Sequence, residues 1–472
     1  MTEKNQKSSH RILLQENRNL FNIGRNLKRI DYSFDLISGK VNEVFYQRDS
    51  IDQFLHKYEY DADNRITDVL TSRDGLIWDH DGRYKYYKHG PLARLEIGEQ
   101  QVQGVDYAYT LQGWLKGINS SSRDSSRDMG RDAVPVSGQA GVFAKDAYAM
   151  TLGYFHDDFK PIGGNEFEAD YNGKPFGNDS YHNSNTGYDD LGLYNGNIRH
   201  SVVSLGKMNY QHIGYVYRYD QLNRYTAMDA YNDFDNANNR WGTISSISEY
   251  KENVAYDPNG NVTYYKRNGS GGSPFTNNMD ILNYAYVPNT NKLKHVQDAV
   301  DASYYANDID NQTRYGVNYL YDATGNMVTD SAEHLHIYWN NYGKLDSTFN
   351  WNSGVAMKFI YDPSSNRIEK RFYSVPGNYS KRTNTYYIRD AQGNILANYV
   401  FKNDDTLSLT ELDIYGSSRL GVLNADTILY DSPNGCNGCK SFVPSPLATY
   451  WLGKKQYELT NHLGNVLTTI TD

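Results

Sequence analysis

Two cysteines, Cys436 and Cys439, stand two residues apart in a Gly/Pro/Ser-rich stretch. This spacing is compatible with half of a metal site, a redox pair or a local disulfide. A zinc site needs about four ligands, but the chain has no second cysteine pair, and nothing in the sequence places His336 or His462 beside the first. A thioredoxin-like pair would open a helix, which such a loop does not provide. An incidental pair or a local disulfide is therefore favoured over metal binding and redox catalysis.

Polar clusters offer a second set of candidates. The segment His156–Asp158 could ligate a hard cation or serve in acid/base chemistry, and Asp233, Asp235 and Asn239 suggest calcium by composition. The latter three lack the glycine and the terminal glutamate of an EF-hand loop. Carboxylate pairs for glycoside hydrolysis could be drawn from many places, and no nucleophile elbow or phosphate loop is present. We therefore expect no catalytic residue, no metal site and no cofactor, so the chain is not expected to be an enzyme.

Composition narrows the class of protein. Of the 472 residues, 44 are tyrosine, and the net charge is −9. A nucleic-acid binder usually carries a basic patch, so no nucleic-acid partner is expected. No run approaches the ~18 apolar residues of a membrane-spanning helix, and residues 1–20 lack the apolar core of a signal peptide. Tyr, Thr, Gly and Asn are also poor helix formers, which argues against a mainly helical protein.

A short pattern, aromatic-x-Tyr-Asp-x-x-Gly-Asn-aliphatic, recurs along the chain. Full or near-full copies begin at Tyr60, Tyr219, Tyr256, Tyr321 and Tyr361. Segments 389–395 and 460–466 keep the frame but replace the tyrosine, and degenerate copies begin near Tyr109, Tyr286 and Trp339. The residues predicted to form these turns are Tyr60, Asp61, Tyr219, Asp220, Tyr256, Asp257, Gly260, Tyr321, Asp322, Gly325, Tyr361, Asp362, Asp390, Gly393, Asn461 and Gly464.

The chemistry of the pattern predicts a β-hairpin. Tyrosines that alternate with other residues before the turn indicate a strand with one aromatic face. Asp-x-x-Gly fits a type I turn in which the Asp side chain accepts a backbone N–H and the glycine supplies a positive φ. Pro258 and Pro363 occupy the position where φ near −65° is required. Each copy therefore reads as one hairpin, with its aliphatic residue opening the return strand.

The spacing of the copies, about 20–30 residues, is shorter than the ~40–45 residues of a propeller blade. Hairpins of this length laid edge to edge bury little alone but share one sheet when stacked. The predicted fold class is all-β, with tandem hairpins forming a spiralling sheet that makes a partial or complete hollow shell or barrel.

These tandem Tyr-Asp units resemble the RHS/YD-repeat proteins, whose relatives include insecticidal toxin-complex shells and the teneurin barrel. Segment 457–466 (YELTNHLGNV) is similar to the RHS-associated core, with Asn461 in place of the usual Asp, and segments 90–94, 106–117 and 217–224 resemble Bacteroidetes-type members. The resemblance covers roughly residues 55–472 and implies a β-shell that encloses a variable C-terminal toxin. The family's self-cleavage motif after the core is absent, and 257–261 reads as a repeat turn.

Five segments are predicted: a polar N-terminal arm (1–20), YD-like β repeats (21–118), a loop-rich insertion with some strands (119–205), the main YD-repeat shell (206–430) and a closing segment with the Cys-containing loop (431–472). Within the insertion, residues 119–133 are expected to form a loop with no core residues.

The expected function is structural: a shell segment that encapsulates or displays a C-terminal toxin or other effector. The expected partners are the remainder of a longer RHS polypeptide or its effector, and the expected location is secreted or cell-surface as part of a larger exported protein. The alternative is a cell-surface adhesin whose tyrosine faces stack on glycans. Packing between strands is the favoured role of these tyrosines.

Overall fold

The computed structural model describes residues 6–13, 27–135, 141–155, 157–161, 167, 192–206, 212–241, 246–271, 277–305, 308–309, 311–374, 381–402, 406–430 and 452–472. Within these residues the secondary structure consists of β-strands and one 3₁₀ turn, η1 (Thr313–Tyr315). None of the described residues forms a helix long and apolar enough to cross a membrane. The all-β fold predicted from the sequence is confirmed.

The chain forms two compact units. The first contains Met1–Gln103 together with His334–Asp472, and the second contains Gly104–Glu333. The first unit is therefore built from both ends of the sequence, and each unit is described by itself below.

The first unit consists of two runs of antiparallel strands, each paired with its neighbours in sequence. The N-terminal run is β1 (Gln6–Leu13), β2 (Leu27–Phe34), β3 (Val41–Tyr46), β4 (Phe54–Tyr60), β5 (Ile66–Ser72), β6 (Asp79–Tyr86) and β7 (Leu92–Ile97). The C-terminal run is β22 (Leu335–Trp339), β23 (Leu345–Asn350), β24 (Ala356–Tyr361), β25 (Arg367–Tyr373), β26 (Arg382–Arg389), β27 (Ile395–Phe401), β28 (Leu407–Tyr415), β29 (Arg419–Tyr430), β30 (Lys455–Thr460) and β31 (Val466–Thr471).

The second unit continues the same antiparallel order. Its strands are β8 (Gln103–Tyr109), β9 (Leu115–Ile118), β10 (Tyr148–Gly153), β11 (His200–Leu205), β12 (Ile213–Tyr219), β13 (Tyr225–Tyr231), β16 (Ile247–Tyr256), β17 (Val262–Asn268), β18 (Asn278–Tyr286), β19 (Leu293–Asp298), β20 (Tyr319–Tyr321) and β21 (Met327–Asp330). A separate small hairpin is formed by β14 (Phe234–Asp235) and β15 (Arg240–Trp241).

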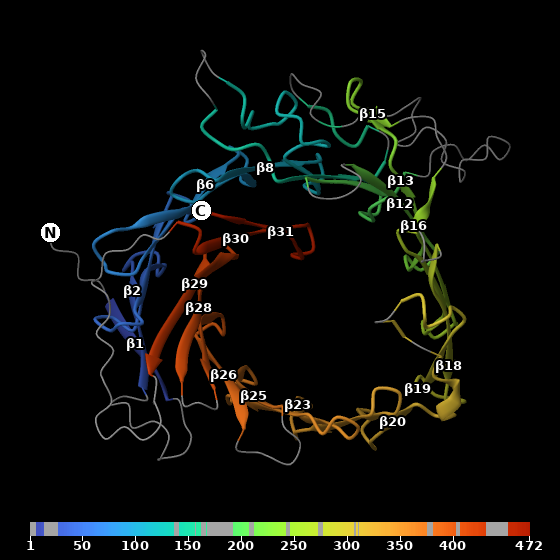
Figure 1. Ribbon diagram of the computed structural model, residues 1–472. Helices are drawn as coiled ribbons and strands as arrows, with labels where there is room; N and C mark the ends of the chain where they lie inside the picture. Colours follow the sequence, from blue (N-terminus) through green and yellow to red (C-terminus); the bar gives the residue numbers. More distant parts are fainter. Residues whose placement is uncertain are drawn as a thin grey trace. The chain divides into compact units, whose positions relative to one another are not determined.

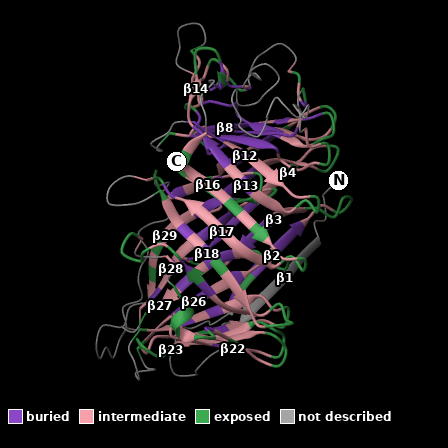
Figure 2. Cartoon of the chain, turned by 90° about the vertical axis from the view of Figure 1, so that its right-hand side faces the viewer, coloured by how far each residue is buried: buried purple, intermediate pink, exposed green. Residues whose placement is uncertain are grey.

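Burial differs between parts of the sheets. All residues of β10 are buried, whereas every residue of β17 and of β23 is half-buried. Exposed residues gather mainly in the turns between strands (Figure 2). Half-burial along a whole strand suits tyrosine, because its ring covers the sheet while its hydroxyl reaches a polar partner.

The first unit has a two-layered core, because the N-terminal run packs against the later strands of the C-terminal run (blue against orange and red in Figure 1). The hydroxyls of Tyr46 on β3 and Tyr399 on β27 lie 2.6 Å apart, and both side chains are fully buried. The backbone N–H of Ala391 donates to the hydroxyl of Tyr32 at 3.1 Å. His56 Nε2 lies 3.2 Å from the backbone oxygen of Asp413.

Buried charges also cross this layer interface. Lys455 Nζ on β30 lies 2.7 Å from an Asp81 carboxylate oxygen and 3.0 Å from Asp79, both on β6. The hydroxyl of Tyr457 donates to Asp81 at 2.7 Å, and Lys455 also contacts Thr71 Oγ1 at 3.1 Å. Burial by itself lowers the pKa of Lys455, but the two carboxylates more than offset this, so its pKa lies above the ordinary value. Asp81 and Lys455 are 0% and 5% exposed, so each neutralises the other away from water.

A second polar cluster links β2 and β27. The ammonium group of Lys28 pairs with the carboxylate of Asp52, which also accepts a hydrogen bond from the Tyr399 hydroxyl at 2.7 Å. Burial raises the pKa of the Tyr399 hydroxyl well above its ordinary value, so this hydroxyl stays protonated and donates.

One expectation for the second unit is wrong. The polar sequence of residues 119–133 predicts a loop without core residues, yet Asn119, Ser120, Ser121 and Asp128 are buried. The Asn119 side chain explains part of this burial: it accepts a hydrogen bond from the Asp106 N–H and donates to the Tyr148 carbonyl, both at 2.8 Å. A polar segment can therefore be internal when backbone groups satisfy it.

The structure describes part of the predicted N-terminal arm but not the Cys-containing loop. Residues 6–13, within the predicted N-terminal arm, form β1, which pairs with β2. The Cys-containing loop at 431–446 lies outside the described residues.

Replacing Lys455 tests the buried charge pair. The variant Lys455→Met leaves Asp81 buried without its cation, and breaking such a pair costs about 3–5 kcal/mol of unfolding free energy. Urea denaturation of the whole chain measures the loss. The control is Lys454→Met, because Lys454 pairs with Asp426 at 3.2 Å on the surface and should change the unfolding free energy by about 0–1 kcal/mol. Equal effects of the two substitutions would contradict the assignment.

Candidate functional site

The recurring turn is held by one aspartate, as the turn at Asp257 between β16 and β17 shows. Its carboxylate Oδ1 accepts the backbone N–H of Asn259 and of Asn261, both at 2.9 Å. The Gly260 N–H donates to the Asp257 carbonyl at 3.0 Å, and the Asp257 N–H donates to the Asn261 carbonyl at 2.9 Å. The side chain thus closes the turn that its own backbone forms.

The same backbone pattern is present at the other predicted turns. The residue that occupies the aspartate position there is Asp61, Asp220, Asp322, Asp362, Asp390 or Asn461, and also Asn340 in the degenerate copy. Each of these side chains accepts the N–H of the residue four positions later.

The fourth turn residue has a positive φ whether or not it is glycine. The glycines at this position, Gly260, Gly325, Gly393 and Gly464, have φ between 81° and 95°. Asn64, Asn223 and Ser365 hold the same position in other copies, with φ of 61–65°. Asparagine tolerates this region better than most residues, which explains the Asn-Arg variants of the sequence pattern.

The fifth turn residue engages the second carboxylate oxygen. In the Asn-Arg copies it is an arginine: Arg65 Nε donates to Asp61 at 2.8 Å, and Arg224 Nε donates to Asp220 at 2.6 Å. The Arg224 guanidinium also lies 4.7 Å from the ring centre of Tyr256 in the next hairpin. A charged turn is thereby joined to its neighbour by a cation–π contact.

Consecutive hairpins are linked by the tyrosine that ends the first strand of each hairpin, directly before the turn. Its hydroxyl donates to a backbone carbonyl at or just before the start of the return strand of the preceding hairpin. The seven bonds, 2.7–3.0 Å long, are Tyr60 to Val41, Tyr86 to Ile66, Tyr219 to Ile198, Tyr256 to Tyr225, Tyr286 to Val262, Tyr321 to Leu293 and Tyr361 to Leu345. We call this series the tyrosine ladder.

The tyrosine ladder coincides with a shift in strand register. In the hairpin of β16 and β17 the register shifts between Ala255 and Tyr256, so Tyr256 pairs with Val262. Such a bulge bends the strand and redirects the side chain, which brings the hydroxyl to the adjacent hairpin. Burial raises the pKa of Tyr219 to about 12, so its hydroxyl is a donor at neutral pH.

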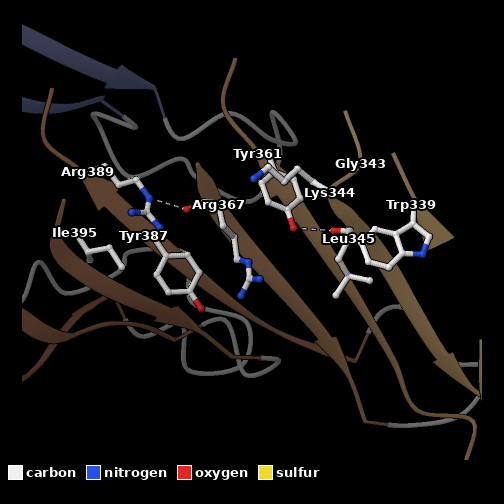
Figure 3. Close-up of a pocket in the computed structure, with 9 residues that line it drawn as sticks. All are labelled: Trp339, Gly343, Lys344, Leu345, Tyr361, Arg367, Tyr387, Arg389 and Ile395. Atoms are coloured by element: carbon white, nitrogen blue, oxygen red, sulfur yellow. Dashed lines mark hydrogen bonds between the residues drawn. The ribbon is translucent and has the colours of Figure 1, made fainter. Parts of the chain in front are cut away.

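In two successive hairpins of the first unit, an arginine stands opposite the tyrosine or in its place. A pocket of about 480 Å³ lies at these hairpins (Figure 3). The pocket is lined by Trp339, Gly343, Lys344, Leu345, Tyr361, Arg367, Tyr387, Arg389 and Ile395. These residues come from three successive hairpins, β22–β23, β24–β25 and β26–β27. The lining carries three cationic side chains and no acidic one, so it favours an anionic group.

The sequence predicted the turn positions but not this pocket. Its signal was visible: segment 389–395 keeps the turn frame while arginine replaces tyrosine. That substitution could have marked the pocket, but the pairing of strands was needed to show that Arg367 lies in the neighbouring hairpin.

Other candidates from the sequence are not assembled into a site. Cys436, Cys439 and His156 lie outside the described residues. Asp158 is buried, pairs with Lys116 at 2.8 Å and accepts the Tyr154 N–H at 2.8 Å. These contacts give Asp158 a structural role.

The calcium hypothesis for residues 233–239 is not favoured by the geometry. Asp235 accepts the N–H groups of Ala237 and Asn238 in the turn between β14 and β15. Asn239, buried and with φ of 49°, donates to the Phe167 carbonyl at 2.7 Å. Both side chains are used to hold the small hairpin against its surroundings.

Two carboxylate groups in the second unit, buried except for the half-buried Asp308, were not predicted from the sequence. One group is Asp106, Asp128 and Asp132, and the other is Asp280, Asp298 and Asp308; in each, the oxygens converge within 4.8 Å. Oxygen sets of this kind could hold a hard cation. Burial raises the pKa of Asp308 to about 7, with the adjacent Asp280 adding to the shift, so a shared proton also satisfies this second group.

Comparisons with known proteins address the fold. No protein-family model and no curated protein matches the chain. Among solved structures, TcdB2-TccC3 without its hypervariable C-terminal region aligns with 98% of this chain at 13% identity and a TM-score of 0.56. The Photorhabdus luminescens Tc holotoxin pore aligns with 99% at 13% identity and a TM-score of 0.55, and TcdB2-TccC3-Cdc42 aligns with 98% at 11% identity and 0.57.

This chain covers only 18–19% of the length of those structures. At such low identity the likeness shows the fold, which is an RHS-type all-β fold.

Removing one ladder hydroxyl measures what the tyrosine ladder contributes. Tyr256→Phe keeps the ring but deletes the donor to the Tyr225 carbonyl, and a net loss of about 0.5–1.5 kcal/mol is expected in urea denaturation. Tyr338→Phe is the matched control because Tyr338 is 51% exposed and should change the unfolding free energy by less than ~0.5 kcal/mol. If Tyr256→Phe behaves like the control, the tyrosine ladder does not couple hairpins.

The turn carboxylate at Asp322 provides a pH test. The Thr324 hydroxyl, the largest cause, together with Asn326 lowers the pKa of Asp322 to about 2. The ionised turn is therefore fully stabilised above about pH 3.8, and that stabilisation is lost as the pH falls through about 2. NMR titration of Thr324→Ala should show the Asp322 pKa rising toward 3.8, whereas Thr329→Ala, outside the turn, should leave it unchanged. An unmoved pKa in Thr324→Ala would contradict the hydroxyl's role.

Proposed function

We propose that this chain is a structural shell segment of an RHS/YD-repeat protein of the Bacteroidetes type, and that it encloses or displays a C-terminal toxin or other effector. The observation that carries the proposal is the tyrosine ladder, because its recurring tyrosines join consecutive hairpins. The aspartates that could do acid/base chemistry are occupied as turn acceptors.

The similar structures support the same role. They are parts of Tc toxins, and one of them is a TcdB2-TccC3 structure that lacks a hypervariable C-terminal region. By analogy, the effector of the present protein is a polypeptide joined to the shell or bound by it. The protein is proposed to be secreted or displayed at the cell surface as part of a larger exported polypeptide.

The proposal assigns no catalysis to this chain. The buried lysine and aspartates of the first unit are bound to one another across a layer interface. These ion pairs fix the charged side chains in place, so none of them is free to act as a nucleophile or a base there.

Protease protection tests enclosure. A compact reporter domain is fused after Asp472 through a cleavable linker, and the same reporter is fused before Met1 as the control. Enclosure predicts that the C-terminal reporter survives at protease concentrations at least tenfold above those that digest the N-terminal one, and that it stays with the shell after linker cleavage. Equal digestion rates and release from the chain would contradict enclosure.

A second candidate function is a carbohydrate-binding surface module. It is favoured by one observation, the aromatic and cationic lining of the pocket at β22–β27. Aromatic faces with polar edges suit sugars, and a sheet that is half-buried along its length can present them.

A further inference from the structure

The pocket in Figure 3 lies where two successive turns depart from the commonest pairing, an aromatic residue opposite an aliphatic one. Across most turns the aromatic residue that ends the first strand faces an aliphatic residue, as Tyr256 faces Val262 and Trp339 faces Leu345. At the pocket, Tyr361 faces Arg367, and Arg389 itself stands at the ladder position, facing Ile395.

Arg389 performs the structural task of the missing tyrosine. Its Nε donates to the Arg367 carbonyl at 2.9 Å, the bond that a ladder hydroxyl would make to the preceding hairpin. Its Nη1 donates to the Gly393 carbonyl. A tyrosine hydroxyl could make the first bond but not the second, and it would carry no charge. With Nε and Nη1 bound to carbonyls, the remaining nitrogen, Nη2, makes no hydrogen bond or ion pair among those found in the described residues.

Arg367 packs on an aromatic ring, but its charge is not paired with an acidic side chain of the described residues. Its guanidinium lies 4.4 Å from the ring centre of Phe359, and its buried Nε donates no hydrogen bond to any described residue. Arg419 occupies the equivalent position opposite Tyr415, but it pairs with Glu458 at 2.8 Å. Neither Arg367 nor Arg389 forms an ion pair with a residue in the described part of the chain.

The rest of the lining fits a flat ring. Trp339, Tyr361 and Tyr387 contribute aromatic rings, and the Tyr361 hydroxyl is already committed to the Leu345 carbonyl. When the hydroxyl of a tyrosine is already hydrogen-bonded, the face of its ring can still pack on the C–H face of a pyranose. A volume of about 480 Å³ lies within the range of small-ligand pockets, ~300–1,000 Å³.

We propose that this pocket binds a sugar that carries a carboxylate, such as a hexuronic acid at the end of a disaccharide. The carboxylate pairs with the Arg367 and Arg389 guanidinium groups, while the ring packs on the neighbouring aromatic side chains. Planar guanidinium groups match a carboxylate in geometry as well as in charge. The sugar uses both parts of the lining, whereas an acidic peptide side chain uses only the cationic part. This inference deepens the carbohydrate-binding candidate above and is independent of the shell role.

Calorimetry with a matched ligand pair tests the proposal. The probes are a glucuronic-acid-terminated disaccharide and the neutral glucose-terminated disaccharide with the same linkage, titrated into the full chain at low salt. We expect the acidic sugar to bind at least tenfold more tightly. In Arg389→Tyr, which restores the ladder residue, that preference should fall to less than threefold, with an unchanged melting temperature.

Two further variants keep the result interpretable. Arg367→Leu places an aliphatic residue where most turns have one and should also abolish the preference. Lys358→Gln removes one positive charge from an exposed position of β24 outside the pocket and should retain it.

The proposal is overturned if the two sugars bind equally, if Arg389→Tyr retains the preference, or if acetyl-glutamate amide binds as tightly as the acidic sugar. Sugar binding that survives both arginine substitutions would preserve the adhesin function but refute this pocket.

Discussion

The hydrogen bond from a tyrosine hydroxyl to a carbonyl of the preceding hairpin is the interaction on which the rest of the structure depends. A hairpin of this length is marginal alone, and strand pairing by itself does not fix how one turn lies against the next. An aspartate shapes most of these turns, the bulge redirects the tyrosine, and the hydroxyl then joins two turns at 2.7–3.0 Å. Architecture therefore accounts for the tyrosines that recur at the ends of these strands.

Two kinds of strand environment follow from this arrangement. Where the two runs of the first unit face each other, the interface encloses apolar side chains together with charged pairs such as Asp81 and Lys455. In β17 and β23 the residues are half-buried throughout. These strands bury little apolar surface, so the hydrogen bonds of the tyrosine ladder and of the turns add to the strand pairing that holds them. Tyrosine is suited to both environments because it combines a large ring with a donor.

Local parts of the fold could be predicted from the sequence, and long-range parts could not. The turn at Asp257 follows from its own residues: an Asx side chain, Pro258 at the second position and a glycine with positive φ. The contact between Tyr46 and Tyr399 joins residues 353 positions apart, and no local pattern specifies it. Residues 119–133 misled the prediction because their serines and aspartates are satisfied internally, which polarity alone does not reveal. The pocket required the register of three hairpins, although Arg389 already marked the place where the pattern changed.

The direction of the tyrosine ladder has a consequence for how the chain is built. In all seven bonds the donor belongs to the later hairpin and the acceptor to the earlier one. During synthesis the amino-terminal part emerges first, so each newly made hairpin meets an acceptor that already exists, and none has to wait for a segment still to be translated. When the sheet grows by adding hairpins at one end, each step closes only a short loop of the chain. The exception is the late docking of the C-terminal strands on the N-terminal ones.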